Sequence, residues 1–148
     1  MLRDDHARVE EMFGRFANAR GGDRKEKLVE QICTELEVHM QLEEDIFYPA
    51  VRAAIGDDDL MDEATVEHQT VKDLIAQLKR MSAGEELYDA KVTVLSEYIK
   101  HHVKEEHAEM FPKARRSGVE LLDLGEQMRA RKEEIAGGTL RKLARMLG

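Results

Sequence analysis

One short polar pattern occurs twice in the sequence and constrains its fold more than any other feature. In the pattern H-x3-E-x5-P, a glutamate follows a histidine by four positions, and a proline comes after five further residues. The first copy begins at His39 and the second at His102, 63 residues further along (102 minus 39). Additional histidines precede the copies at His6 and His68, 62 residues apart (68 minus 6). The chain is therefore predicted to use one structural unit, a pair of helices, twice.

Apolar residues recur every three or four positions through four long stretches, which predicts amphipathic helices. The expected helices cover approximately residues 4–20, 23–49, 60–84 and 86–115. Short connections favour antiparallel neighbours, so the fold class is all-α, an up-down-up-down four-helix bundle with an additional C-terminal helical segment. Pro49 is expected to kink or end the second helix. The inward stripe of the third helix is expected to contain Ala64, His68, Val71, Ile75 and Leu78.

The C-terminal part differs in charge from the rest of the chain. We expect a metal-binding bundle over residues 1–117 and an amphipathic helical extension over residues 118–148, divided at Gly137 and Gly138. A basic amphipathic helix can bind an anionic membrane surface, a partner or an acidic bundle. Packing on the bundle or on a partner is the interpretation we favour, which makes the protein a monomer or a dimer through this segment. Its expected apolar contacts are Leu140, Leu143 and Leu147.

Composition excludes several classes of function. A net charge of -8 argues against general binding of nucleic acid, which needs clustered basic residues. No apolar run approaches the roughly 20 residues needed to span a bilayer. The N-terminus lacks the apolar segment of a signal peptide, so a cytoplasmic location is expected. The single cysteine, Cys33, is interpreted as a small buried hydrophobic residue.

The repeated pattern carries candidate chemistry. A histidine and a glutamate four residues apart lie on one face of a helix, and two such pairs on neighbouring helices would face each other. In the first copy the pair interrupts an apolar stripe that includes Leu36 and Phe47, which indicates that the polar groups point inward. Buried carboxylates are normally paired, neutralised or bound to metal. The candidate metal ligands are His6, His39, Glu43, His68, His102 and Glu106.

Four imidazoles and two carboxylates fit two metal ions, each held by two histidines, with both glutamates bridging, since a carboxylate offers two oxygens. The donor set suits iron, manganese or zinc, and it lacks the thiolates of an iron–sulfur cluster. The alternative is that the histidine–glutamate pairs are ordinary salt bridges in a metal-free structural bundle. Recurrence of the whole set in register favours the metal site.

At these positions the sequence resembles the haemerythrin-like proteins, which contain histidine-histidine-glutamate (HHE) cation-binding domains. The resemblance covers roughly residues 1–115. It implies a four-helix bundle with two non-haem iron ions bridged by Glu43 and Glu106. Activities in the family range from oxygen binding to the handling of peroxide, nitric oxide or iron.

One position departs from the oxygen-carrying members of that family. Those members have a second histidine one turn after the first in the third helix, and this chain has Lys72. The remaining set is more similar to bacterial members linked to iron handling and to oxidative or nitrosative stress. We therefore expect a di-iron protein that binds or reacts with oxygen, peroxide or nitric oxide, with consumption of peroxide or nitric oxide as the candidate enzymatic activity. The alternative is an iron or redox sensor or carrier without turnover.

Several polar positions near the repeat have competing interpretations. His101 competes with His102 as the ligand, and the repeat favours His102. His107 occupies the position of Glu44 in the other copy, and both are interpreted as solvated rather than as partners of the ligands. Tyr98, one turn before His102, is interpreted as core packing, with lining of the metal pocket as the alternative.

Overall fold

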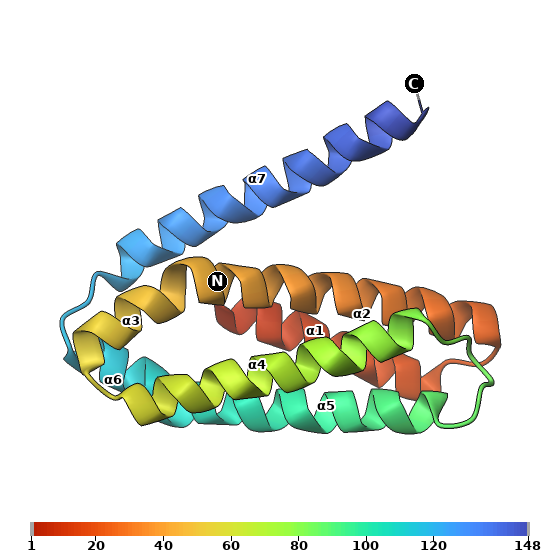
Figure 1. Cartoon of the computed structure of the whole chain (residues 1–148), viewed down its shortest axis with the longest axis horizontal. Helices are drawn as coiled ribbons and strands as arrows, with labels where there is room; N and C mark the ends of the chain where they lie inside the picture. Colours follow the sequence, from red (N-terminus) through yellow and green to blue (C-terminus); the bar gives the residue numbers. More distant parts are fainter. Residues whose placement is uncertain (1, 148) are drawn as a thin grey trace.

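The protein forms an elongated helical bundle (Figure 1). In the computed structural model, backbone is described for residues 2–147 and side chains for residues 2–137. No strand occurs in these residues. The predicted all-α, up-down-up-down bundle is confirmed, although the helix ends differ by a few residues from those expected. The four long helices are α1 (Leu2–Asn18), α2 (Gly22–Leu42), α4 (Asp58–Lys79) and α5 (Tyr88–Glu105).

The order of packing around the bundle sets which helices can share a site. Helix α1 packs along α2, and α4 packs along α5, so each predicted helix pair forms a hairpin. The hairpins join through α2 beside α4 and α1 beside α5. Helices α2 and α5, which carry the repeated pattern, are therefore diagonal and run in the same direction (Figure 1). The expectation that they are neighbours is wrong.

A π-helical turn follows each repeated histidine–glutamate pair. These turns are η1 (Glu43–Phe47) and η2 (Glu106–Met110), and they lead into α3 (Tyr48–Ile55) and α6 (Phe111–Arg116).

The prolines explain why the helix widens instead of ending. The backbone N–H of Tyr48 donates to the carbonyl of Glu43, five residues back. Pro49 follows immediately, at the start of α3. Proline has no N–H, and its ring clashes with the carbonyl four residues back in a regular α-helix, which the wider turn avoids. The second copy repeats this arrangement before Pro112.

The apolar core has two parts, one on each side of a polar layer. One part fills the end of the bundle that has the α1–α2 and α4–α5 connections, and includes Val9, Phe13, Ile32, Leu36 and Val71. The other part fills the end with the π-helical turns, and includes Leu42, Phe47, Met61, Val51 and Met110. All five residues of the predicted α4 stripe are buried, as is Cys33. The six candidate ligands form the layer between the two parts.

Helix α7 (Leu121–Leu147) extends beyond the bundle. Leu124 and Met128 pack into the second part of the core, and Ile135 packs against it. The C-terminal end of the helix points away from the bundle (Figure 1). Its backbone stays helical through Gly137 and Gly138, so the predicted division there is wrong. Each glycine costs only about 1 kcal/mol relative to alanine in a helix, which does not by itself end one. The expected contacts of Leu140, Leu143 and Leu147 lie outside the described side chains.

Across the described helices, none combines the length and the apolar character that a membrane span requires.

Candidate metal centre

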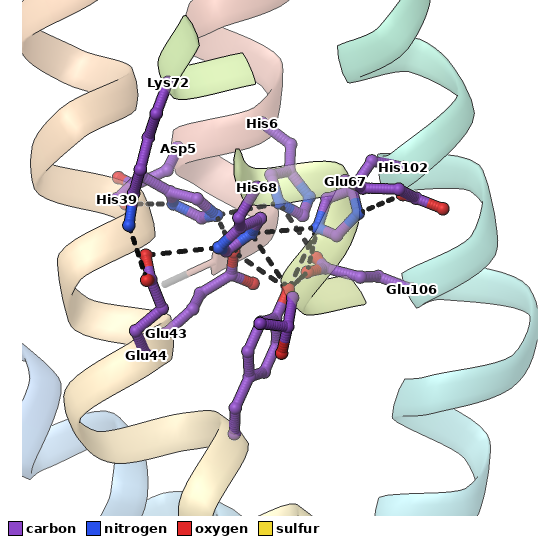
Figure 2. A network of polar contacts seen from close by, with 12 residues as sticks. Asp5, His6, His39, Glu43, Glu44, Glu67, His68, Lys72, His102 and Glu106 are labelled. Atoms are coloured by element: carbon purple, nitrogen blue, oxygen red, sulfur yellow. Dashed lines mark hydrogen bonds and ion pairs between the residues drawn. The ribbon is translucent and has the colours of Figure 1, made fainter. Parts of the chain in front are cut away.

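The six predicted ligands meet in the middle of the bundle. Figure 2 shows their side chains pointing toward one another from four helices. They form two overlapping groups in which one ligand atom from each residue lies within 4.8 Å of the others. Both groups contain Glu43 and Glu106. The first group adds His6 and His39, and the second adds His68 and His102.

In the first group, the donor atoms face one small volume. The Nε2 atoms of His6 and His39 are 3.1 Å apart. His39 Nε2 lies 3.2 Å from Oε1 of Glu43, and His6 Nε2 lies 3.3 Å from Oε2 of Glu106. Each histidine of this group therefore approaches a different glutamate.

The second group has the same arrangement. The Nε2 atoms of His68 and His102 are 3.2 Å apart. His68 Nε2 lies 3.2 Å from Oε1 of Glu43, and His102 Nε2 lies 2.9 Å from Oε1 of Glu106. Each glutamate thus contacts one histidine from each hairpin, which is the arrangement that a bridging carboxylate requires.

The donor set fits a pair of metal ions. Glu43 is fully buried and Glu106 is 1% exposed. Among the described residues, neither Oε2 atom has a hydrogen-bond partner, although that of Glu106 lies within ion-pair distance of His6. Two ligands at about 2.1 Å from one ion are roughly 3.0–3.4 Å apart at angles near 90–109°. The Nε2 atoms have this spacing, and a cation between them would satisfy the unpartnered carboxylate oxygens.

The residues that precede His6 in α1 and His68 in α4 are carboxylates, and each contacts a histidine on the next long helix. Asp5 Oδ2 lies 3.1 Å from Nδ1 of His39, and Glu67 Oε2 lies 2.6 Å from Nδ1 of His102. Asp5 is itself buried and contacts Lys132 of α7 at 3.0 Å. A carboxylate on Nδ1 fixes the imidazole tautomer and leaves Nε2 free to bind a metal.

The residue that follows each repeated glutamate contacts a histidine of the other hairpin. Glu44 Oε2 lies 3.3 Å from Nδ1 of His68, and His107 Nε2 lies 3.0 Å from Nδ1 of His6. The interpretation of Glu44 and His107 as solvated is therefore wrong. All four candidate histidine ligands have a polar partner on Nδ1 and turn Nε2 toward the centre.

Electrostatic coupling across the site is strong. Burial lowers the pKa of His39, but the charge of Glu43 and hydrogen bonding to Asp5 outweigh burial and raise the pKa to about 10. Burial also opposes protonation of His102, whose contacts with Glu106 and Glu67 raise its pKa to about 11. In the metal-free protein these imidazoles therefore carry protons that compensate the buried carboxylates.

Tyr48 is an inner residue of the site that the sequence did not reveal. Its phenolic oxygen lies 2.6 Å from Oε1 of Glu106, to which the hydroxyl donates. The same oxygen is 2.9 Å from Nε2 of His102 and 3.1 Å from Nε2 of His68. Burial and the two glutamates raise the pKa of Tyr48 well above its usual value, so the phenol is neutral. The repeated proline after the π-helical turn was the available signal.

The other ambiguous residues lie outside this inner layer. Tyr98 is 42% exposed, so neither core packing nor lining of the pocket describes it. His101 is exposed and groups with Glu67 and Glu105, whereas His102 is buried. Lys72 bonds to Oε1 of Glu44 at 2.6 Å (Figure 2). Lys72 thus contacts the outer partner of His68.

Comparison with family models matches residues 1–114 to the hemerythrin HHE cation binding domain. The matched segment contains all six candidate ligands and Tyr48.

Curated relatives are distant. An uncharacterized Mycobacterium tuberculosis protein, Rv2633c, is 28% identical over 121 residues, which cover 80% of this chain and 73% of that protein. A protein from Nostoc named DNA nickase is 27% identical over 111 residues, covering 75% of this chain. The matched region is 31% of the Nostoc protein's length, so that name describes a much larger chain.

The fold also has a solved counterpart. A crystal structure of a hemerythrin HHE cation-binding domain-containing protein from Mycobacterium kansasii, a homologue of Rv2633c, aligns with a TM-score of 0.80. The alignment covers 97% of this chain and 89% of that chain, at 27% sequence identity.

Proposed function

The chain belongs to the hemerythrin HHE cation-binding domain family, and from that premise we propose that it is a di-iron protein that reacts with a small oxidant. Metal binding follows from the family and from the His and Glu clusters. We add that the metal is iron, that each chain binds two ions, and that they react with the oxidant. Oxygen, peroxide and nitric oxide are the candidate oxidants. The main support is that the Oε2 atoms of Glu43 and Glu106 are buried among four inward-facing imidazoles, with no hydrogen-bond partner in the described part of the chain.

In this proposal the two hairpins contribute equally. His6 and His39 would hold one ion, and His68 and His102 would hold the other. Glu43 and Glu106 would be shared between the two, because each already contacts one histidine of each group. The outer partners on Nδ1 keep the four rings in place, which limits the reorganisation needed when metal binds or changes charge.

Iron at these positions would supply redox electrons and open coordination positions for a small oxidant. The protein supplies a dry, oriented environment and a proton. Tyr48 holds its phenolic proton on Oε1 of Glu106, within hydrogen-bond distance of the second group of donors. A neutral phenol there can donate to a reduced oxygen or nitrogen species as negative charge develops on it. The first group has no equivalent phenol, because Phe111 occupies the corresponding position.

The experiment is to measure metal content and oxidant reactivity in the same preparation. Protein loaded with ferrous iron without oxygen should contain two ions per chain. Its optical spectrum should change on addition of peroxide, nitric oxide or oxygen. Iron content well below two ions per chain, or a spectrum indifferent to all three oxidants, would overturn the proposal. A His39→Ala/His102→Ala variant is the matched control, because it removes one donor from each group.

A second candidate is an iron or redox sensor without turnover. The buried glutamates favour it as well, since a site that is costly to leave empty links metal occupancy to the stability of the bundle. This candidate predicts one reaction with oxidant per loaded chain, whereas an enzyme consumes many equivalents. Counting peroxide or nitric oxide consumed per iron pair distinguishes the two.

A further inference from the structure

A small cavity lies against the inner layer, on the side away from Tyr48. It measures about 20 Å³ and touches all four candidate histidines and Glu43. Its other walls come from residues one turn before the repeated histidines, such as Leu36 and Ile99, and from Val9 and Val71. A cavity needs about 10–15 Å³ to hold one water molecule, so this one accommodates a molecule of about that size.

A larger groove lies outside this cavity, between α2 and α4. It measures about 480 Å³ and is open to solvent. Ile75 and Ala76 of α4 line one side, and residues of α2 and η1 line the other. Lys72 and Glu44, which pair with each other, lie in the same groove. The groove therefore brings solvent next to the outer partner of His68.

Met40 separates the two spaces. It follows His39 directly and is 3% exposed. Among the described residues, it is the one that lines both the inner cavity and the outer groove. Its repeat mate is Val103 (103 minus 40 is 63), which lines the cavity on the opposite hairpin but not the groove. A methionine side chain has three rotatable bonds and repacks easily, so it can move aside and open a passage between the two spaces.

We propose that Met40 is the gate through which a small uncharged oxidant passes from the α2–α4 groove to the metal centre, and that it sets the size limit for that oxidant. The inference rests on the proposed function and specifies its substrate class. The groove carries no excess positive charge to attract an anion. Lys72 pairs with Glu44, Lys79 pairs with Glu37, and Asp45 pairs with Arg131 of α7.

The cavity walls other than the candidate ligands are mainly apolar, as at Leu36, Val71 and Ile99, and they offer an entering ion no partner. They therefore also disfavour a charged substrate, because transferring an ion out of water without a partner is costly. Nitric oxide, oxygen and hydrogen peroxide satisfy both the charge and the size limits. A bulky organic hydroperoxide has the same reactive group but does not fit a space of about 20 Å³. The ratio of the reaction rates with hydrogen peroxide and with tert-butyl hydroperoxide therefore measures the size limit that the gate sets.

The test compares four variants in the iron-loaded protein: Met40→Leu, Met40→Phe, Met40→Ala and Gln41→Phe. Stopped-flow binding of nitric oxide to the ferrous protein gives an entry rate that does not depend on turnover. We expect Met40→Phe to slow entry about tenfold or more, equivalent to a barrier about 1.4 kcal/mol higher. Met40→Leu is nearly isosteric and should keep the binding rate within a few-fold of wild type. Met40→Ala should admit tert-butyl hydroperoxide, which wild type excludes.

Iron content and thermal melting of each variant identify any that fail to fold or load. Gln41→Phe controls for added bulk beside the gate, because Gln41 is exposed and lines the groove but not the cavity, and it should leave the nitric oxide rate close to wild type. Equally slow entry in Gln41→Phe and Met40→Phe overturns the gate, because the groove and not Met40 would then limit entry. Equal rates in all variants, or reaction of wild type with tert-butyl hydroperoxide, also overturn it. If the wild-type protein binds iron but reacts with neither nitric oxide nor hydrogen peroxide, the proposed function itself is overturned.

Discussion

The hydroxyl of Tyr48 donates a hydrogen bond of 2.6 Å to Oε1 of Glu106, from the other hairpin. This bond places a proton beside both glutamates and both histidines of the second donor group. In Tyr48→Phe the ring remains but the proton is lost. We expect iron content to stay at two per chain and the reaction with peroxide to slow about 100-fold, the lower end for loss of a general acid. Stopped-flow rates at matched iron content measure the effect.

Tyr98→Phe is the matched control for that change. It removes the same hydroxyl from a side chain that is 42% exposed, and should react at the wild-type rate. Equal rates in Tyr48→Phe and wild type would exclude the phenol from proton transfer.

The outer carboxylates should tune metal affinity. Replacing Asp5 or Glu67 with the corresponding amide keeps the shape of the side chain but removes the charge on Nδ1 of His39 or His102. We expect Asp5→Asn and Glu67→Gln each to weaken iron binding by about 10–100-fold. Competition with a calibrated chelator measures the affinity. Glu97→Gln, on the exposed face of α5, should bind iron as wild type does; an equal loss in that variant would show that total charge, not contact with the ring, is responsible.

Metal removal should lower thermal stability. A ligand at about 1,000 times its dissociation constant stabilises the folded state by about 4 kcal/mol. For a chain of this length each kcal/mol shifts Tm by about 2–4 °C, so iron is expected to raise Tm by roughly 8–16 °C. Calorimetry with and without iron measures the difference. Glu43→Gln/Glu106→Gln lacks the bridging charges, and its Tm should hardly respond to iron.

Metal loading should release protons. In the metal-free protein the pKa of His39 is raised to about 10 and that of His102 to about 11, so both rings are protonated at pH 7.5. A metal binds the deprotonated ring, so these protons must leave. We expect about two protons per chain from these residues, and iron affinity that rises with pH up to these values. A pH-indicator dye in weak buffer detects the release. No release at pH 7.5 would mean that the rings are already neutral.

Much of the site followed from the sequence because α-helical geometry is regular. His39 and Glu43 are four residues apart, so a regular helix places them on one face, and the structure does so. Recurrence at a constant spacing then distinguished this pair from a surface ion pair. The same regularity made Tyr98 misleading. It lies one turn before His102, but the buried stripe runs through Ile99 and leaves Tyr98 on the flank.

Tyr48 could not be placed by the same geometry. In a regular α-helix a residue five positions after Glu43 points about 140° away from it. The π-helical turn over Glu43–Phe47 bonds residues five apart, which brings the tyrosine over the glutamate. The proline after each turn indicated an irregularity, but not its direction. The course of α7 was also beyond the sequence, since two glycines only weaken a helix and do not determine where it stops.

The repetition of the hairpin has a consequence for the two metal positions. Two identical hairpins would create two equivalent positions, with one redox potential and one rate of ligand exchange. The actual pairs of corresponding residues differ where they touch the centre: tyrosine against phenylalanine at 48 and 111, glutamate against histidine at 44 and 107, methionine against valine at 40 and 103. The ligands repeat, but these neighbours of the ligands do not, so the two half-sites are inequivalent. In a di-iron centre, one electron added to the pair would therefore reside preferentially on one side.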